Sequence, residues 1–474
     1  MIVLARAPFL PILAGLAAML ALPIPIWTMP LVAVLGAAGV ALVSFRHDRI
    51  GQWRVGAFTL LCAFVCSCWA AYGLGFPRRV TGNGLLGSRL DTTGTVVEGR
   101  AWGRMYAFAV DTPRGRFVLT QPFDTLPEGA AVRVSGVVRP FRAQGDGFRE
   151  DRFWYSRGVA ARLTSAAAEA LPEQHWNIHA WRRHLTRALS VHMPALTGDY
   201  LKAAWTGKRD EALLAAHRVW GTSHLLAVSG FHVGIVMMCA SCLFRRGVMR
   251  VFWLSLTLWA YLLLTGGAPS ALRAGLMIQA ALLGELAGRP AGALNSVALA
   301  AVVLLMGNPY RFWDIGWRLS VLAALTIGAV LERAEPGDWR TWPVLSLLIW
   351  LATYPQVART FGSVPLVGLP LNLIAPPLFA FALTVASAAA LLSLAGLLPD
   401  LLLEAVDGTF ALWAVLADAA AQIMPWQAEW SVWGAWLCTG VLLTLICRSL
   451  LVPWRSVAVV VPALGAGAFW LFGG

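Results

Sequence analysis

The residues with the clearest chemical potential lie together at positions 222–234, where the sequence reads Thr-Ser-His-Leu-Leu-Ala-Val-Ser-Gly-Phe-His-Val-Gly. This signature segment opens a long apolar stretch, and a polar group inside a membrane costs free energy unless it finds a partner or faces a hydrated cavity. Ser229 and His232 are expected to share one helix face, while Gly230 and Gly234 would let another backbone approach closely. The pattern indicates either tight helix packing with internal hydrogen bonds or a polar-lined path.

The same side chains do not match a known catalytic or metal-binding pattern. Ser229 lacks the flanking glycines of a nucleophile elbow. His224 and His232 would lie about 12 Å apart along one helix, which is too far to share a metal ion. The sequence contains no H-E-x-x-H motif and no Walker A loop. We therefore expect no enzyme activity, catalytic residue, metal or cofactor, and ATP-driven movement would need another protein.

Further polar clusters interrupt the apolar sequence after the signature segment. An arginine at a membrane helix centre costs about 2.5–3.5 kcal/mol, so Arg273 should face a cavity, a carboxylate or the interface, or reach the surface. Asp314 and Arg318 have the spacing of a helical ion pair. Prolines near Gln356 and Asn372 predict broken helices, which are tolerated only where they are buried in protein or line water.

Composition places the chain in the membrane class. Of its 474 residues, 58% are hydrophobic and 13% are charged, against about 25% charged residues in a soluble domain. The pattern predicts a polytopic α-helical membrane protein with a small all-β domain inserted. The expected apolar segments are 9–26, 28–45, 55–76, 224–244, 251–266, 271–288, 294–307, 319–331, 342–357, 371–397, 400–424, 431–447 and 455–472.

Arginines outside these segments predict the orientation. The formal net charge is +13, and cytoplasmic loops of membrane proteins carry the excess of positive charge. The amino terminus is therefore expected in the cytoplasm and the polar region after residue 76 outside. Two basic clusters mark the cytoplasmic side: Arg46, Arg49 and Arg54, and Arg245, Arg246 and Arg250.

Residues 77–170 have the alternating pattern of short strands, at 94–98, 106–110, 116–120 and 131–138. Their spacing suits a small antiparallel barrel or sandwich, and a five-stranded OB-like barrel is the topology we expect. We expect four regions: membrane helices at 1–76, an extracytoplasmic OB-like domain at 77–170, interfacial helices at 171–221, with one near 176–193 and another at 195–220, and a second membrane domain at 222–474.

Basic and aromatic residues alternate in the expected β domain. Arginines neutralise phosphates and aromatic rings stack on bases, as in proteins that bind single strands, although aromatic residues on strands also form cores. The candidate DNA contacts are Arg100, Trp102, Arg104, Arg114, Arg116, Arg139, Phe141, Arg142, Arg149 and Arg152.

The signature segment resembles that of the ComEC family of competence DNA channels. Four segments in the same order extend the similarity: Thr206–Arg209, Pro269–Arg273, Asp314–Ser320 and Gln356–Pro377. The end of the expected β domain, Gly147–Gly158, is similar to the end of the family's outer OB-like domain. The resemblance implies a multi-pass channel of the bacterial inner membrane that admits single-stranded DNA during natural transformation, with the β domain in the periplasm.

The resemblance also implies path residues and partners. The partners would be single-stranded DNA, the lipid bilayer, a periplasmic DNA receptor, a cytoplasmic single-strand-binding protein and a helicase or ATPase; a homo-oligomer is left open. Many family members carry a metallo-β-lactamase-like domain, whose H-x-H-x-D-H ligands this sequence lacks, so we expect no nuclease activity. The residues expected to line or gate the path are His224, Ser229, Gly230, His232, Gly234, Arg273, Asp314, Arg318, Gln356 and Asn372.

Three other functions are compatible with these residues. A transporter could carry another anionic solute along the same helices. A membrane DNA receptor could bind without transport. A membrane enzyme could use His224, Ser229 and His232, although no carboxylate lies close to them in sequence.

Overall fold

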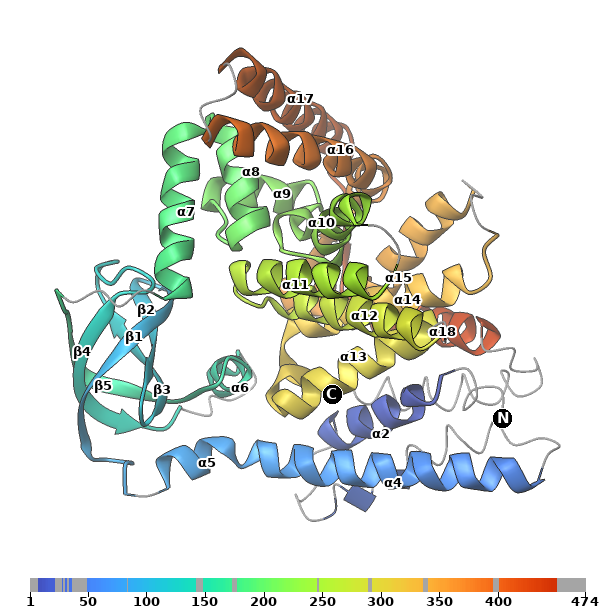
Figure 1. The fold of residues 1–474 in the computed structure, drawn as a ribbon, viewed down its shortest axis with the longest axis horizontal. Helices are drawn as coiled ribbons and strands as arrows, with labels where there is room; N and C mark the ends of the chain where they lie inside the picture. Colours follow the sequence, from blue (N-terminus) through green and yellow to red (C-terminus); the bar gives the residue numbers. More distant parts are fainter. Residues whose placement is uncertain are drawn as a thin grey trace. The chain divides into compact units, whose positions relative to one another are not determined.

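The computed structural model describes residues 7–21, 28, 30–31, 34–35, 49–82, 84–141, 148–172, 177–244, 247–288, 292–335, 340–394 and 400–449. The chain divides into two compact units (Figure 1). The helical unit comprises 1–67, 189–303 and 315–474, and the barrel unit comprises 68–188 and 304–314. The expected segment 455–472, most of 28–45, and Arg46, Arg142, Arg245 and Arg246 lie outside the described residues.

The barrel unit contains a closed five-stranded barrel with the order β1-β2-β3-β5-β4. All neighbouring strands are antiparallel except β3 and β5, which are parallel. A barrel was one of the two architectures expected from the spacing of the strands, but that spacing says nothing of the parallel pair. The strands are β1 (Arg89–Trp102), β2 (Met105–Thr112), β3 (Gly115–Gln121), β4 (Ala131–Arg139) and β5 (Val159–Ala170).

The fifth strand was not among the runs singled out in the sequence. β5 is rich in alanine, the strongest helix former, so its local preference opposes its conformation. It pairs with β4 along most of its length and with β3 at its start, which closes the barrel. Tertiary hydrogen bonding therefore overrides local propensity here.

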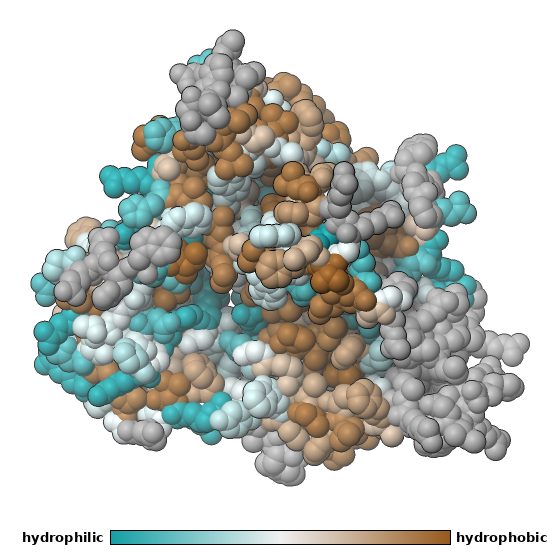
Figure 2. Space-filling model, in the orientation of Figure 1, coloured by the Kyte–Doolittle hydropathy of each residue, from teal (hydrophilic) through white to brown (hydrophobic). Residues whose placement is uncertain are grey.

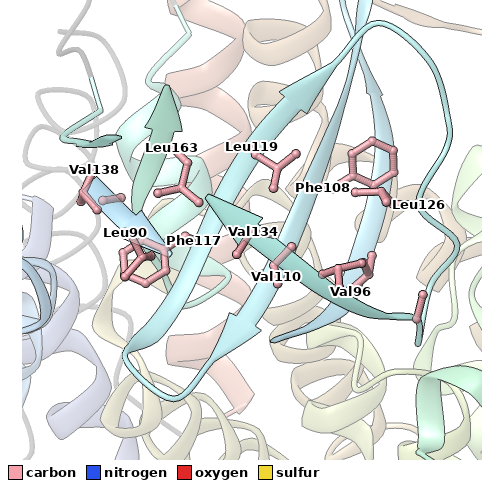
Figure 3. Packing of buried hydrophobic residues seen from close by; sticks show 13 residues of the cluster. Leu90, Val96, Phe108, Val110, Phe117, Leu119, Leu126, Val134, Val138 and Leu163 are labelled. Carbon is pink, nitrogen blue, oxygen red and sulfur yellow. The ribbon is translucent and has the colours of Figure 1, made fainter. Parts of the chain in front are cut away.

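The barrel interior is filled by alternate side chains of the strands (Figure 3). Phe108 and Val110 of β2 meet Phe117 and Leu119 of β3, and all four are almost completely buried. Burial of one such side chain contributes about 1.5–3 kcal/mol. The alternation that predicted strands therefore also supplies the core.

A second buried cluster covers the outer side of β2 and β3. It contains Ala107, Ala109, Phe141 and, from α6 (Glu150–Ser156), Trp154. This packing explains why Ala107 and Ala109 are buried although they point away from the barrel interior. Phe141 and Trp154, both in the connection between β4 and β5, therefore belong to the core of the barrel unit.

Helices make up most of the rest of the chain. Those in or leading to the barrel unit are α4 (Arg49–Leu74), α5 (Phe76–Thr81), α6, α7 (Ile178–His192), α13 (Ala293–Gly307) and the 3-10 helix η2 (Pro309–Trp313). The others are α2 (Phe9–Ala21), α8 (Ala195–Thr206), α9 (Glu211–Val219), η1 (Ser223–Leu226), α10 (Gly230–Leu243), α11 (Val248–Leu264), α12 (Pro269–Leu286), α14 (Ile315–Leu331), α15 (Thr341–Phe361), α16 (Gly368–Leu394), α17 (Asp400–Ile423) and α18 (Val432–Ser449). A two-stranded ribbon, β6 (Ser363–Pro365) with β7 (Gln427–Glu429), joins two connections.

Within the described ranges, four helical stretches are long and apolar enough to cross a membrane: Ala57–Leu74, Gly368–Leu394, Leu403–Ile423 and Val432–Ser449. Five shorter apolar helices accompany them. Many large apolar side chains of the helical unit are exposed, among them Leu263, Phe381 and Leu416, and Figure 2 shows hydrophobic side chains over much of its visible face. An exposed apolar surface of this extent is typical of contact with lipid, and the chain is a membrane protein.

Two expected helices have different limits. The single helix expected over 195–220 is divided into α8 and α9, because Gly207 adopts a left-handed conformation (φ +73°) that ends α8. Asp210 then caps α9 by accepting a hydrogen bond from the N–H of Leu213. α4 begins at Arg49, so Arg49 and Arg54 of the expected loop lie on a helix.

The helices expected to be broken by proline are continuous. Pro355 lies inside α15, and Pro376 and Pro377 lie inside α16. Proline lacks the N–H that the carbonyl four residues earlier would accept, so Pro377 frees the carbonyl of Leu373. The indole N–H of Trp342 donates to that oxygen at 3.0 Å. A contact from the neighbouring helix thus compensates for the proline, as in other membrane helices.

Candidate functional site

The signature segment is not one continuous helix, contrary to the expectation for 224–244. η1 ends at Leu226, the backbone is then extended, and α10 starts at Gly230. Ser229 is the N-cap of α10 rather than a residue on its face. Serine is favoured at this position because its side chain bonds to free backbone groups at the helix start. The 12 Å separation of His224 and His232 along one helix therefore does not apply.

Ser229 and His232 form a reciprocal cap at the start of α10. The backbone N–H of Ser229 donates to Nδ1 of His232 at 3.3 Å, and the Ser229 hydroxyl lies 3.1 Å from the same nitrogen. Because a backbone N–H can only donate, Nδ1 is an acceptor and the proton of the neutral ring is on Nε2. His232 therefore positions the helix start in addition to any contact that it makes with a solute.

We expect His232→Ala to lower the free energy of unfolding by about 0.5–2 kcal/mol, because it removes the side-chain half of this cap. His232→Gln should lose less, since glutamine at this position completes a capping box with serine. Thermal unfolding of the purified full-length protein compares the two variants. Equal losses in both would show that the cap does not stabilise the protein.

Only the first of the two signature glycines provides a close approach. A Cβ on Gly230 would lie 3.2 Å from Cβ of Ala274 and 3.8 Å from Nη2 of Arg273. A Cβ on Gly234 would meet no described atom within 4 Å. Gly230 thus lets α12 pack against the start of α10, and the expected pair of packing glycines reduces to one.

Arg273 is buried beside the signature segment, with 8% of its surface exposed. Its Nε donates to the hydroxyl of Ser320 on α14 at 2.8 Å. Among the described residues no carboxylate lies within 4 Å of this guanidinium. Within the described structure Arg273 therefore neither pairs with a carboxylate nor reaches the surface, two of the outcomes expected from the sequence.

Two further contacts link the expected path residues within the helical unit. Arg318 donates to Oε1 of Gln356 at 3.4 Å, which joins α14 to α15. Asn372 donates to the carbonyl of Gly221 at 3.3 Å, which joins α16 to the residue before the signature segment. His224, in η1, is exposed. The signature segment is therefore held between α12 and α16.

A buried hydrogen-bonded chain before the signature segment was not found from the sequence. The hydroxyl of Tyr200 lies 2.8 Å from Nε2 of His217, and Nδ1 of His217 lies 2.8 Å from Oγ1 of Thr222. All three residues are at most 2% exposed, among the rings of Phe379 and Phe410. The sequence shows Thr222 only as the first residue of the signature segment, and a histidine on a short amphipathic helix gives no distinguishing signal.

Asp314 lies in the barrel unit and pairs with Arg157 at 3.6 Å. It ends η2, which packs against α6; Asn308 donates to the carbonyls of Tyr155 and Ser156 at 2.9 and 3.1 Å. Burial raises the pKa of Tyr310 to about 12, so its phenol stays neutral and donates to the carbonyl of Leu74 at 2.8 Å. The expected Asp314–Arg318 ion pair stays a prediction.

The candidate DNA contacts on the barrel fall into three groups. Phe141 is 7% exposed and belongs to the core, so its ring cannot stack on a base. Arg104, Arg114 and Arg139 are exposed and have no ion pair among the described residues. Four arginines are engaged within the unit: Arg100 with Glu98 (3.5 Å), Arg116 with Asp111 (3.2 Å), Arg149 with Asp151 (2.9 Å), and Arg152 over the ring of Trp313 (4.6 Å).

Four rings form an aromatic cluster beside these arginines: Trp102, Phe148, Phe153 and Trp154. Trp102 ends β1, and its ring centroid lies 5.7 Å from that of Phe148 and 5.2 Å from those of Phe153 and Trp154. Phe148 is 60% exposed. The cluster therefore combines a fully buried ring, that of Trp154, with a ring open to solvent, that of Phe148.

A family model described as Competence protein matches residues 205–469. The chain belongs to the Competence protein family. Its similarity to "ComE operon protein 3" of Bacillus subtilis (strain 168) is 25% identity over 333 residues, covering 59% of this chain and 43% of that protein. An uncharacterized protein of Aquifex aeolicus (strain VF5) is 30% identical over 188 residues, covering 40% of this chain and 45% of the relative. The alignments thus span less than half the length of each relative, and no solved structure matches.

The resemblance inferred from the signature segment is confirmed at the level of the family. The Competence match contains every expected path residue from His224 to Asn372 and also His217, while the barrel lies before its first residue. Among the described residues no group of three or more His, Cys, Asp or Glu side chains could hold a metal ion. The described part of the Competence region presents buried polar contacts, among them those of His217, His232 and Gln356.

Proposed function

We propose that this Competence family member conducts single-stranded DNA across the bacterial inner membrane during natural transformation. The observation that carries the proposal is the family match over a helical unit that buries two polar side chains, His232 of the signature segment and Arg273. A conducting path needs several weak polar contacts, because one tight site would stop the moving strand. Ser229, His232, Gln356 and Asn372 supply such contacts, and Arg273 supplies charge.

The same proposal includes a cytoplasmic amino terminus, a β domain outside the membrane, and the four regions expected from the sequence. With Arg250 at the cytoplasmic start of α11, alternate crossings would put the connections 362–367 and 424–431 outside. Two findings support this arrangement. β6 and β7 pair these two connections with each other, and Trp426 and Trp433 near them are exposed, as in the aromatic belt at a membrane surface.

The barrel would be an OB-like domain that captures the strand outside the membrane. The strand order and the parallel β3–β5 pair support this assignment, and OB folds bind through β2–β3 and the β1–β2 and β4–β5 connections. Trp102 and Phe148 lie at these two connections, and Arg104 is exposed beside them. Stacking on the rings and attraction to the arginine would hold single strands without sequence preference.

We expect the double substitution Trp102→Ala and Phe148→Ala to weaken binding of a single-stranded oligonucleotide about 10- to 100-fold, since stacking contributes about 1–3 kcal/mol per base. Fluorescence anisotropy with the full-length protein in detergent measures the change. Phe123→Ala is the matched control, because this ring is 72% exposed and lies outside the cluster. Equal affinity in all three proteins would remove the aromatic cluster from the binding surface.

Transport is tested with the full-length protein in lipid vesicles, together with transformation of a deletion strain. Labelled single-stranded DNA should become protected from added nuclease, while duplex DNA and small organic anions should not enter. Binding without protection would identify a receptor, and entry of the organic anion alone would identify a transporter for another solute. Normal transformation of the deletion strain would exclude the proposed role.

We also propose cytoplasmic partners, a single-strand-binding protein and a helicase or ATPase. Cytoplasmic extract with ATP, added to the vesicle assay, should increase the entry of DNA if such partners act on this protein.

A further inference from the structure

Two helix starts and a buried arginine converge at the signature segment. α10 begins at Gly230 and α12 begins at Pro269. The hydroxyl of Ser270 donates to the carbonyl of Val228 at 2.5 Å, which holds the two starts together. Each helix start carries the equivalent of about half a positive charge from its aligned peptide dipoles.

The start of α10 has free hydrogen-bond donors. The first N–H groups of an α-helix have no acceptor within the helix. For α10 these include the N–H groups of Gly230 and Phe231, and neither has another acceptor among the described residues. Gly230 has no side chain, and a Cβ there would lie 3.2 Å from Cβ of Ala274, so a methyl group at this position would crowd the helix start.

Arg273 adds a full charge at the same place. Its Nη2 lies 3.8 Å from the position that a Gly230 Cβ would occupy. Ser320 takes only Nε, and Nη1 has a 4.0 Å contact with the sulfur of Met277. Arg273 as a residue is more than nine-tenths buried, and its guanidinium has no carboxylate partner among the described residues. Nothing in the described structure neutralises the charge.

An uncompensated buried cation is costly, so the place favours an anion. A carboxylate of the chain would provide one permanently, whereas free N–H groups beside an arginine bind oxyanions from solution. A tetrahedral oxyanion can accept from a helix start and from a guanidinium together, because its oxygens point in different directions.

We propose that Gly230, Phe231 and Arg273 form an oxyanion-binding site for a single phosphate group. The identity of the natural ligand rests on the proposed function. That ligand is one phosphodiester of the DNA strand, bound while the strand passes the signature segment. The site takes the charge and shape of phosphate and reads no base.

Inorganic phosphate is the probe, with the full-length protein in detergent. Thermal unfolding is followed across a phosphate series and across a chloride series of matched ionic strength. Phosphate should stabilise the protein saturably and chloride should not. Arg273→Gln and Gly230→Ala should weaken the apparent phosphate affinity at least about tenfold, as expected for loss of a charged hydrogen bond or of access to the helix start. Arg273→Lys, which keeps the charge, should weaken it less.

Gly408→Ala is the matched control, because it adds the same methyl group to a helix where no described atom lies within 4 Å. Its phosphate affinity should equal that of the unchanged protein. Equal stabilisation by chloride, or equal phosphate affinity in Arg273→Gln and Gly230→Ala, would overturn the site.

The site and the proposed function fail in different ways. Arg273-dependent phosphate binding in a protein that admits no DNA into vesicles would support the site and reject the channel. Entry of DNA into vesicles together with unchanged phosphate affinity in both variants would support the channel and reject the site.

Discussion

Replacing Arg273 with alanine or methionine is expected to lower transformation about 10- to 100-fold, as expected for loss of a charged hydrogen bond worth about 1.5–3 kcal/mol. The amount of protein in the membrane should stay normal. Arg273 has no carboxylate partner among the described residues, so its removal leaves no orphaned charge. Methionine also fills much of the volume, which limits the cavity term.

Transformation frequency and membrane abundance, measured on the same cultures, check this expectation. Arg333→Ala is the matched control, because Arg333 is exposed two residues after the end of α14 and bears no proposed role. A loss of transformation matched by an equal loss of protein would assign Arg273 to stability. Normal transformation in both Arg273 variants would remove it from the path.

Replacing His217 with alanine is expected to lower the free energy of unfolding by about 3–5 kcal/mol. The change would leave the Tyr200 hydroxyl and the Thr222 hydroxyl without their buried partner, at about 1–3 kcal/mol each, and would open a cavity among aromatic rings. Because Thr222 starts the signature segment, the segment should lose its fixed position before the rest of the helical unit. Membrane abundance and transformation should then fall together.

Unfolding of the purified protein by heat and by denaturant measures this effect. Tyr200→Phe removes one hydroxyl and should cost about 1–2 kcal/mol, less than His217→Ala. His184→Ala is the control, since His184 is exposed on α7. Equal stability of His217→Ala and His184→Ala would show that the buried chain does not hold the signature segment.

The candidate site could be located from the sequence because polar residues are rare in apolar segments. Ser229, His232 and Arg273 stood out for that reason, and the structure brings all three to one place. Their contacts could not be predicted, because capping at Ser229 depends on where the helix starts. At that start Gly230 packs against Ala274, a residue of another helix that lies 44 positions later in the chain.

By itself the sequence determined the membrane class, the alternating strands and the family signature, because hydropathy and period are local properties. Only the tertiary structure decided that the alanine-rich β5 closes the barrel, that Pro377 stays within a helix beside Trp342, and that residues 304–314 belong to the barrel unit. Each of these depends on a partner far away in the chain. The energy of such pairing exceeds local preference, and local preference is all that a sequence pattern displays.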